Sequence, residues 1–316
     1  MTKTKKQKKL FNGAKHAWMF LAPFIILYLV FGFFPIVYSF IISLTDWTFG
    51  KEVHFVGFKN YIDLIFHDKF FWLSVGNTFL LMLLYIPGSM ILAIFLANLI
   101  FQKETKGKRF FQIVFFAPNI TTAVAVGLMF ALIFDWQTGV LNGILNRFGI
   151  ESVNWLGQPG TARLVVGLMA FWGYFGYCTI FYLSGMAGIS EDLYEAAMLD
   201  GANKRQTFWH ITFPNLKQTT SFLLITSVIS GAQIMEEPQL LLNGWATVGQ
   251  TVGGPERSCL TIVWYLYDTA FGGTGALQYG KGSTIGYVSF VILMVIIFGT
   301  QAISAKIKKA RGTYEE

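Results

Sequence analysis

Six long apolar stretches constrain the fold of this chain more than any other feature of its sequence. The hydrocarbon core of a bilayer is about 30 Å thick, and a helix that rises about 1.5 Å per residue crosses it in roughly 20 residues. Each stretch reaches that length without a Lys or Arg inside it. The stretches cover residues 18–44, 77–101, 110–134, 164–189, 219–242 and 283–305. The sequence therefore predicts an all-α membrane protein with six transmembrane helices.

The composition supports the same class of protein. Hydrophobic residues make up 54% of the 316 residues and charged residues only 13%, which leaves too few charges to cover a soluble globule of this size. The formal net charge is +7, but the basic residues form short clusters beside the apolar stretches rather than one basic face. We therefore expect the surface of the protein to face the lipid bilayer, and we exclude nucleic acid as a partner.

The basic residues also predict the orientation of the helices. Lys and Arg near the ends of transmembrane helices are retained in the cytoplasm. With the N-terminus inside, 17 of the 24 Lys and Arg residues fall on the cytoplasmic side. Both termini are thus predicted to be cytoplasmic, with a basic tail over 1–16, a membrane domain over 17–305 and a second tail over 306–316. The first stretch is too long for a secretory signal peptide, so we expect it to be kept as a helix.

Residues that can carry catalysis or hold a metal are scattered along the chain. The two cysteines, Cys178 and Cys259, fall in segments far apart in the sequence, so we expect neither a disulfide nor a thiolate metal site. The four histidines have none of the spacings of a helical zinc site. We therefore predict no catalytic residue, no metal and no enzyme activity on this chain.

The polar segment 190–217, predicted to be cytoplasmic, has the pattern of a helix, a turn and a second helix. Ser190 is a favourable N-cap, and Gly201 can adopt the left-handed conformation that ends a helix. Pro214 is then placed to begin the second helix. Two consecutive alanines leave part of the first helix nearly without side chains, so another protein surface can approach its backbone. The segment is either a docking element or an ordinary amphipathic connector.

A longer pattern within this segment favours docking. It consists of Glu-Ala-Ala, three residues, Gly, nine residues and Ile, with Pro214 close behind. This pattern resembles the EAA loop of bacterial ABC importer permeases, which couples closure of the ATPase subunits to the membrane helices; Phe213 stands where that family usually has Leu. The resemblance implies that a separate ATPase is coupled through Glu195, Ala196, Ala197, Asp200, Gly201, Ile211 and Pro214.

Other segments resemble a narrower group, the carbohydrate-uptake permeases of the maltose and oligosaccharide systems. They are residues 253–255 with the nearby Tyr265 and Tyr267, residues 55–61, and the pair Asn77 and Thr78. The resemblance implies a type I ABC importer permease fold in the cytoplasmic (inner) membrane of a bacterium. It also implies a second homologous permease, two ATPase subunits that bind ATP and Mg, an extracytoplasmic solute-binding protein and a sugar substrate. No cofactor is then expected on this chain itself.

Polar and aromatic side chains inside the apolar stretches are the candidates for a substrate path, because an unpaired polar group is costly in a membrane. In the fifth stretch, polar residues recur at i, i+3, i+6 and i+10 and would share one helix face. In the fourth, aromatic rings with polar edges can stack on the C–H faces of a sugar. The candidates are Asn119, Trp172, Tyr174, Tyr177, Ser227, Ser230, Gln233 and Glu237. The alternatives are a subunit contact for the polar face and plain packing for the aromatic rings.

The substrate class follows from charge. The absence of Lys and Arg from the six stretches disfavours a phosphorylated solute such as glycerol 3-phosphate and favours a neutral sugar, with an oligosaccharide as the expected substrate. Two alternatives stay open. One is an ABC permease for glycerol 3-phosphate or another small solute. The other is a self-sufficient secondary transporter that uses Glu236 or Glu237 as a proton carrier, although this alternative gives the segment 190–217 no purpose.

Overall fold

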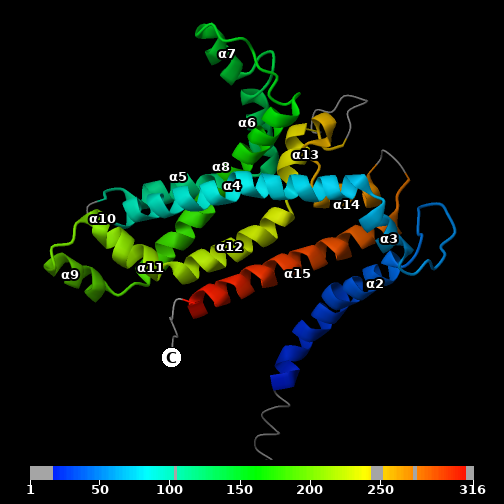
Figure 1. Ribbon diagram of the computed structural model, residues 1–316, viewed down its shortest axis with the longest axis horizontal. Coiled ribbons are helices and arrows are strands. Elements are labelled where there is room, and N and C mark those ends of the chain that lie inside the picture. The colour runs from blue at the N-terminus through cyan, green and yellow to red at the C-terminus, as the bar shows by residue number, and fades with distance from the viewer. Residues whose placement is uncertain (1–16, 103–104, 243–251, 273–275, 311–316) are drawn as a thin grey trace, which may run out of the picture. The chain divides into compact units, whose positions relative to one another are not determined.

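The computed structural model describes residues 17–102, 105–242, 252–272 and 276–310 (Figure 1). The described residues are mostly helical, and they contain two isolated β-bridges but no β-strand. The predicted all-α fold is thus confirmed. The predicted N-terminal tail over 1–16 and the last residues of the C-terminal tail, 311–316, lie outside the described residues.

Four of the described helices are long and apolar enough to cross a membrane. They are the helix Ala17–Ser43, α4 (Lys69–Phe101), α8 (Pro159–Ala187) and the Tyr279–Gly299 part of α15 (Tyr279–Ala310). They coincide with the first, second, fourth and sixth predicted stretches. α4 begins earlier than predicted because Asp68 caps it, accepting hydrogen bonds at Oδ1 from the N–H groups of Phe70 (2.9 Å) and Phe71 (3.0 Å).

The third predicted stretch, 110–134, is not one straight helix. It forms α5 (Lys108–Ile120) and α6 (Ala123–Ile133), which are bent by 93° relative to one another. Between them Thr121 and Thr122 have extended backbone angles, with ψ of 142° and 137°. β-branched residues favour extended conformations, and this local preference ends α5 and redirects the chain. If the bent pair is counted as one broken span, the described residues hold five spans.

The fifth predicted stretch, 219–242, is also interrupted. It forms α12 (Lys217–Ala232) and α13 (Glu236–Leu242), and α12 alone is shorter than the roughly 20 residues that a span requires. Pro238 explains the break, because a continuous helix would clash with the proline ring and lose a backbone hydrogen bond. In the first turn of a new helix a proline loses nothing, and Glu236 and Glu237 there interact favourably with the helix dipole. The prediction of one continuous helix here was wrong.

The helices form two compact units, Met1–His67 with Thr269–Val288 and Asp68–Asp268 with Ser289–Glu316. The larger unit holds α4 to α6, α8, α12 and α13. Its shorter elements are α7 (Val140–Arg147), α9 (Glu191–Leu199), α10 (Lys204–Thr207), the π-helix η2 (Phe208–Thr212), α11 (Phe213–Asn215), the 3-10 turn η3 (Pro255–Arg257) and most of α14 (Ile262–Phe271).

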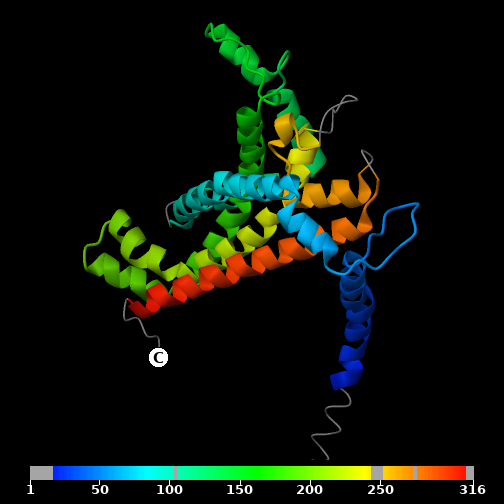
Figure 2. The same cartoon turned by 45° about the vertical axis from the view of Figure 1, so that its right-hand side comes forward.

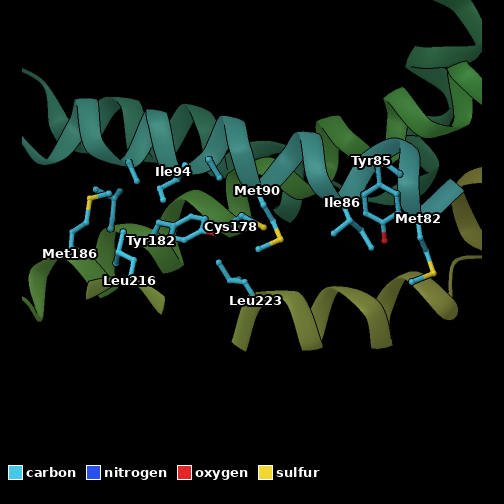
Figure 3. Packing of buried hydrophobic residues seen from close by; sticks show 14 of the residues in the cluster. Met82, Tyr85, Ile86, Met90, Ile94, Cys178, Tyr182, Met186, Leu216 and Leu223 are labelled. Carbon is cyan, nitrogen blue, oxygen red and sulfur yellow. The ribbon is translucent and has the colours of Figure 1, made fainter. Parts of the chain in front are cut away.

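The core of the larger unit lies where α4, α8 and α12 meet (Figure 3). Helices α4 and α8 pack along much of their length, and α12 packs on both. Gly231 permits the close approach of α12 to α4, since a Cβ at that position would lie 2.8 Å from both Met82 Cγ and the Tyr85 hydroxyl. The buried cluster includes Met82, Tyr85, Ile86, Met90, Cys178, Tyr182, Met186, Leu216 and Leu223.

The smaller unit is organised around the end of its first long helix. That helix contains a π-helical turn, η1 (Leu29–Phe33), and ends as α2 (Phe34–Ser43). The Asn60 side chain, in α3 (Lys59–Phe66), donates hydrogen bonds to the carbonyl oxygens of Ser43 (2.9 Å) and Thr45 (2.7 Å). The segment 55–61, which the sequence analysis singled out, therefore fixes the direction in which the chain leaves α2.

Candidate functional site

The segment 190–217 forms a helix, a turn and a second helix, and its first helix and turn agree with the sequence prediction. α9 follows Ser190, which occupies the N-cap position without a side-chain capping bond. Asp200 ends the helix, and Gly201 has a φ of +76°, in the left-handed region that favours glycine. The predicted conformation of Gly201 is confirmed, whereas the coupling function of the segment stays a prediction at this point.

The second helix of this segment begins earlier than predicted. Asn203 and Gln206 form a capping box, in which Gln206 N donates to Asn203 Oδ1 (2.9 Å) and Asn203 N donates to Gln206 Oε1 (2.8 Å). The helix therefore starts at Lys204, and Pro214 lies within its continuation rather than at its beginning. The preceding turn, η2, is widened to a π-helix, and such turns commonly relieve the clash that a proline would cause in a regular helix.

Helix α9 exposes large apolar side chains, two of them at its C-terminal end. Leu199 is 89% exposed and Met198 73% exposed, and Leu193 is exposed as well. Ala197 is buried, while Ala196 beside it is exposed and leaves the backbone accessible. Exposed apolar patches of this kind mark surfaces that bind another protein. Of the other predicted coupling residues, Glu195, Asp200 and Gly201 are exposed and Ile211 and Pro214 are half-buried.

The α9–α11 segment is attached to the C-terminal end of α4 (Figures 1 and 2). The Phe208 ring of η2 stacks on Phe95 with 5.8 Å between ring centroids. The Tyr194 ring of α9 lies 6.0 Å from that of Phe101, and Lys204 Nζ donates to Gln102 Oε1 (3.2 Å). Two ring contacts and one hydrogen bond therefore join the α9–α11 segment to the end of α4, a helix long and apolar enough to cross a membrane.

A second group of predicted residues meets where α8 faces α12. The Tyr174 hydroxyl lies 2.7 Å from Ser227 Oγ, and its ring is stacked on that of Tyr177 with centroids 5.5 Å apart. Tyr85 of α4 contacts Tyr174 edge-on at 5.7 Å. Ser227 Oγ also donates to the Leu223 carbonyl (2.5 Å), so its hydrogen bonds stay inside the helix bundle. Ser227 is thus a structural partner of Tyr174 and does not lie on an open face.

The other predicted path residues do not all join this group. Glu237 belongs to α13, beyond the break at the end of α12, so the predicted face at i, i+3, i+6 and i+10 is not a single helix face. Trp172 packs against the Phe130 ring of α6 at 6.0 Å. Asn119 is exposed beside the α5–α6 bend. Trp172 thus contacts α6, Glu237 lies on a different helix from the rest of the predicted face, and Asn119 lies at the α5–α6 bend; the part of these three residues in a substrate path stays a prediction.

The accessible stripe on α12 differs from the predicted one. It consists of Phe222, Thr226, Ile229 and Ser230 with Gln233, the residue that follows α12; all five lie on one side of the helix and are exposed or half-exposed. The Gln233 amide donates to the Ile229 carbonyl (3.1 Å). Neither Phe222 nor Thr226 was predicted, because Phe222 is apolar and Thr226 lies outside the predicted series at i, i+3, i+6 and i+10. A search for one helical face of mixed aromatic and polar character would have found them.

Segments that resemble those of the carbohydrate-uptake permeases come together toward the N-terminal end of α4. Asn77 Nδ2 donates to the carbonyl oxygens of Arg257 (2.8 Å) and Leu260 (3.2 Å), and Thr78 Oγ1 accepts from Ile262 N (3.0 Å). Arg163, in the first turn of α8, donates to Asn77 Oδ1 (3.2 Å). These contacts fasten the loop before α14 to both long helices, so this pair has a defined structural function.

No group of three or more His, Cys, Asp or Glu residues that can hold a metal ion occurs in the described part of the chain. Cys178 and Cys259 are both buried, and neither forms a disulfide. The two candidate regions offer exposed apolar side chains on α9 and aromatic and hydroxyl groups on α8 and α12.

Long apolar helices bound to a polar helix–turn–helix define the class of this chain, a multi-span helical membrane protein. A chain in the crystal structure of a bacterial alginate ABC transporter, in complex with alginate pentasaccharide-bound periplasmic protein, has the same fold. It matches with a TM-score of 0.80 and 24% identity, over 95% of this chain and 99% of that one. The family of binding-protein-dependent transport system inner membrane components matches residues 89–306, and this chain belongs to that family.

Two relatives extend the match over nearly the whole sequence. The arabinooligosaccharides transport system permease protein AraP of Bacillus subtilis is 33% identical over 95% of this chain and 92% of its own length. The lactose transport system permease protein LacF of Rhizobium radiobacter is 30% identical over 90% of this chain and 92% of its own. The predicted resemblance to ABC importer permeases is therefore confirmed, and the chain is a permease component of a binding-protein-dependent importer.

Proposed function

We propose that this permease carries a neutral oligosaccharide, delivered by an extracytoplasmic solute-binding protein, across the cytoplasmic membrane of a bacterium. The observation that carries the proposal is the pairing of stacked tyrosine rings on α8 with an accessible polar stripe on α12. Aromatic faces bind the C–H faces of sugars, and hydroxyl and amide groups satisfy sugar hydroxyls. The names of the relatives, which refer to arabino-oligosaccharides and lactose, support the same substrate class.

The charge distribution along α8 agrees with a neutral substrate. Arg163 lies eleven positions before Tyr174, about 16 Å along the helix. Its guanidinium group donates to the Ser258 carbonyl (3.0 Å) and to Asn77 Oδ1 (3.2 Å). A phosphorylated solute at the tyrosine pair would find no cation supplied by α8 or α12, because neither helix has a Lys or Arg between its first turn and its last residue.

We also propose that ATP is hydrolysed on separate subunits, and the exposed apolar side chains of α9 support this proposal. Two ATPase subunits, which bind ATP and Mg, are proposed to cover Met198 and Leu199, and a second homologous permease completes the membrane pair. No catalytic residue or cofactor of this chain enters the mechanism. A secondary transporter, the alternative class, has no use for an exposed apolar helix in the cytoplasm.

The proposed mechanism is alternating access. When the ATPases close, they displace α9, and the Phe95–Phe208 and Phe101–Tyr194 contacts pass the displacement to α4. Because α4 packs along α8, and α12 packs on both, the movement reaches the face that carries Tyr177 and Gln233. The sugar is then released to the cytoplasmic side.

The substrate class is tested by purifying the permease with its partner permease and ATPases in nanodiscs. Binding protein is added with each member of a panel of neutral oligosaccharides, and glycerol 3-phosphate is tested in parallel. We expect the neutral oligosaccharides to stimulate ATP hydrolysis and glycerol 3-phosphate to have no effect. Stimulation by glycerol 3-phosphate alone would overturn the proposed substrate.

A further inference from the structure

Aromatic rings continue beyond the tyrosine pair in an unbroken series. On α8 the Tyr177 ring is followed by Phe181, with 4.6 Å between centroids, and Phe181 is stacked on Phe222 of α12 at 5.5 Å and an interplanar angle of 28°. With the Tyr174–Tyr177 pair, these rings form a row of four. We call this row the aromatic ladder; it comprises Tyr174, Tyr177, Phe181 and Phe222.

The direction of the ladder follows from the positions of its rings in the helices. Tyr174 lies near the middle of α8, whereas Phe181 lies in the last third of that helix. Phe222 lies in the second turn of α12, which follows the α9–α11 segment. The ladder therefore runs from the middle of the bundle toward the end where the α9–α11 segment is attached. The seven residues from Tyr174 to Phe181 span about 10 Å along α8.

The environment of the ladder argues against a lipid-facing surface. Phe222 is 48% exposed, and Tyr177 and Phe181 are half-buried. The residues that continue the same face of α12 are Thr226, Ile229, Ser230 and Gln233, and the polar groups among them face water or a polar partner in membrane proteins. The exposed surfaces of these rings, beside hydroxyl and amide groups, can contact the C–H face of a sugar.

We propose that Phe181 and Phe222 are sugar-stacking residues of the exit half of the path, on which an oligosaccharide slides from Tyr177 toward the cytoplasm. This inference rests on the proposed sugar substrate and adds to it a dependence on chain length. A single sugar ring occupies one position of the ladder at a time. A longer oligosaccharide spans several positions, so it is held by Phe181 and Phe222 while its first rings leave Tyr177.

The test compares Phe181→Leu and Phe222→Leu with wild type in proteoliposomes that contain the complete complex. Leucine keeps an apolar side chain but removes the flat ring. Uptake rates are measured for the monosaccharide, disaccharide, trisaccharide and pentasaccharide of one neutral series. The control is Phe290→Leu on α15, a phenylalanine that is 58% exposed and lies outside the ladder. Phe222→Trp is included because it restores a stacking ring.

We expect both leucine variants to slow trisaccharide and pentasaccharide uptake roughly 2- to 10-fold, the range that one lost aromatic contact implies, and to leave monosaccharide uptake unchanged. Phe290→Leu should match wild type, and Phe222→Trp should recover the rate. Equal loss at every chain length, unchanged uptake throughout, or reduced recovery of the partner permease would each overturn the exit-path assignment. If the wild-type complex transports no member of the series, the proposed substrate itself is wrong, independently of the ladder.

Discussion

Gly176 of α8 lies so close to the backbone of α5 that a Cβ at this position would be 1.8 Å from the Phe115 carbonyl oxygen. No side-chain movement can relieve this contact, because the neighbouring atom belongs to the backbone. The two helices can approach in this way only while residue 176 is glycine, as is typical of helix pairs in membranes. The position of α5 against α8 depends on this close approach.

The first prediction follows from that contact. Gly176→Ala should force α5 and α8 apart and lower the stability of the permease by about 1–3 kcal/mol, the usual cost of overpacking. Thermal denaturation of the purified complex in detergent measures the change. Gly173→Ala is the matched control, since a Cβ at Gly173 would meet no atom within 4 Å. A Gly176→Ala variant that melts at the temperature of the Gly173→Ala variant would contradict the described packing.

The second prediction concerns the turn after α9. A Cβ at Gly201 would meet no neighbouring atom, so the constraint there is its φ of +76° alone. Gly201→Val should strain the turn by about 1–2 kcal/mol and redirect α9, because a β-branched residue tolerates this conformation poorly. We expect uptake to fall while membrane insertion is unchanged. Gly201→Asn, which tolerates positive φ, should keep most of the uptake, and equal uptake in the Val variant would refute the assignment.

The third prediction tests the exposed face of α9. Leu199 is 89% exposed in the isolated permease, so Leu199→Ser should leave its own stability unchanged. If the ATPase covers this side chain, the substitution removes about 1.5–3 kcal/mol of apolar burial from the complex. The affinity of the permease for the ATPase should then fall roughly 10- to 150-fold, so that much less ATPase co-purifies. Phe148→Ser, at a side chain that is 78% exposed beyond α7, serves as the control and should retain the ATPase. Equal recovery from both variants would count against docking on α9.

The fourth prediction separates a path residue from a subunit contact. Gln233 is exposed, and its amide donates to the Ile229 carbonyl of its own helix. Gln233→Leu should leave a hydroxyl of the passing sugar unmatched, at a cost of about 1 kcal/mol or more, which slows uptake roughly fivefold. Recovery of the partner permease should be unchanged. Loss of that partner would place Gln233 in the subunit interface, and normal uptake with normal recovery would exclude both assignments.

Sequence patterns predict those parts of the fold that depend on one segment alone. Helices α4 and α8 follow from continuous apolar stretches that are long enough to cross a bilayer. The left-handed conformation of Gly201 follows from the residue type and from its place after α9. The capping box of Asn203 and Gln206 also follows from one segment, since a polar residue with Gln three positions later is a known signal for the start of a helix.

The parts that the sequence analysis missed depend on competition between local and distant contacts. Pro238 is compatible with a kinked span or with a new helix, and hydropathy alone does not distinguish the two. Similarly, the extended pair Thr121 and Thr122 lies inside a run that is apolar enough to be helical throughout. The contact between Phe181 and Phe222 joins two helices separated by the whole α9–α11 segment, so neither local pattern contains it.

The central claim, that this chain is the permease of an ATP-driven sugar importer, is tested most directly by the energy source of uptake. Proteoliposomes carry the complex with or without internal ATP and Mg, and they are given an oligosaccharide-loaded binding protein outside, with no ion gradient. We predict that labelled oligosaccharide accumulates only when ATP is enclosed and binding protein is present. Accumulation without ATP, driven instead by an imposed proton or sodium gradient, would contradict the account and identify a secondary transporter.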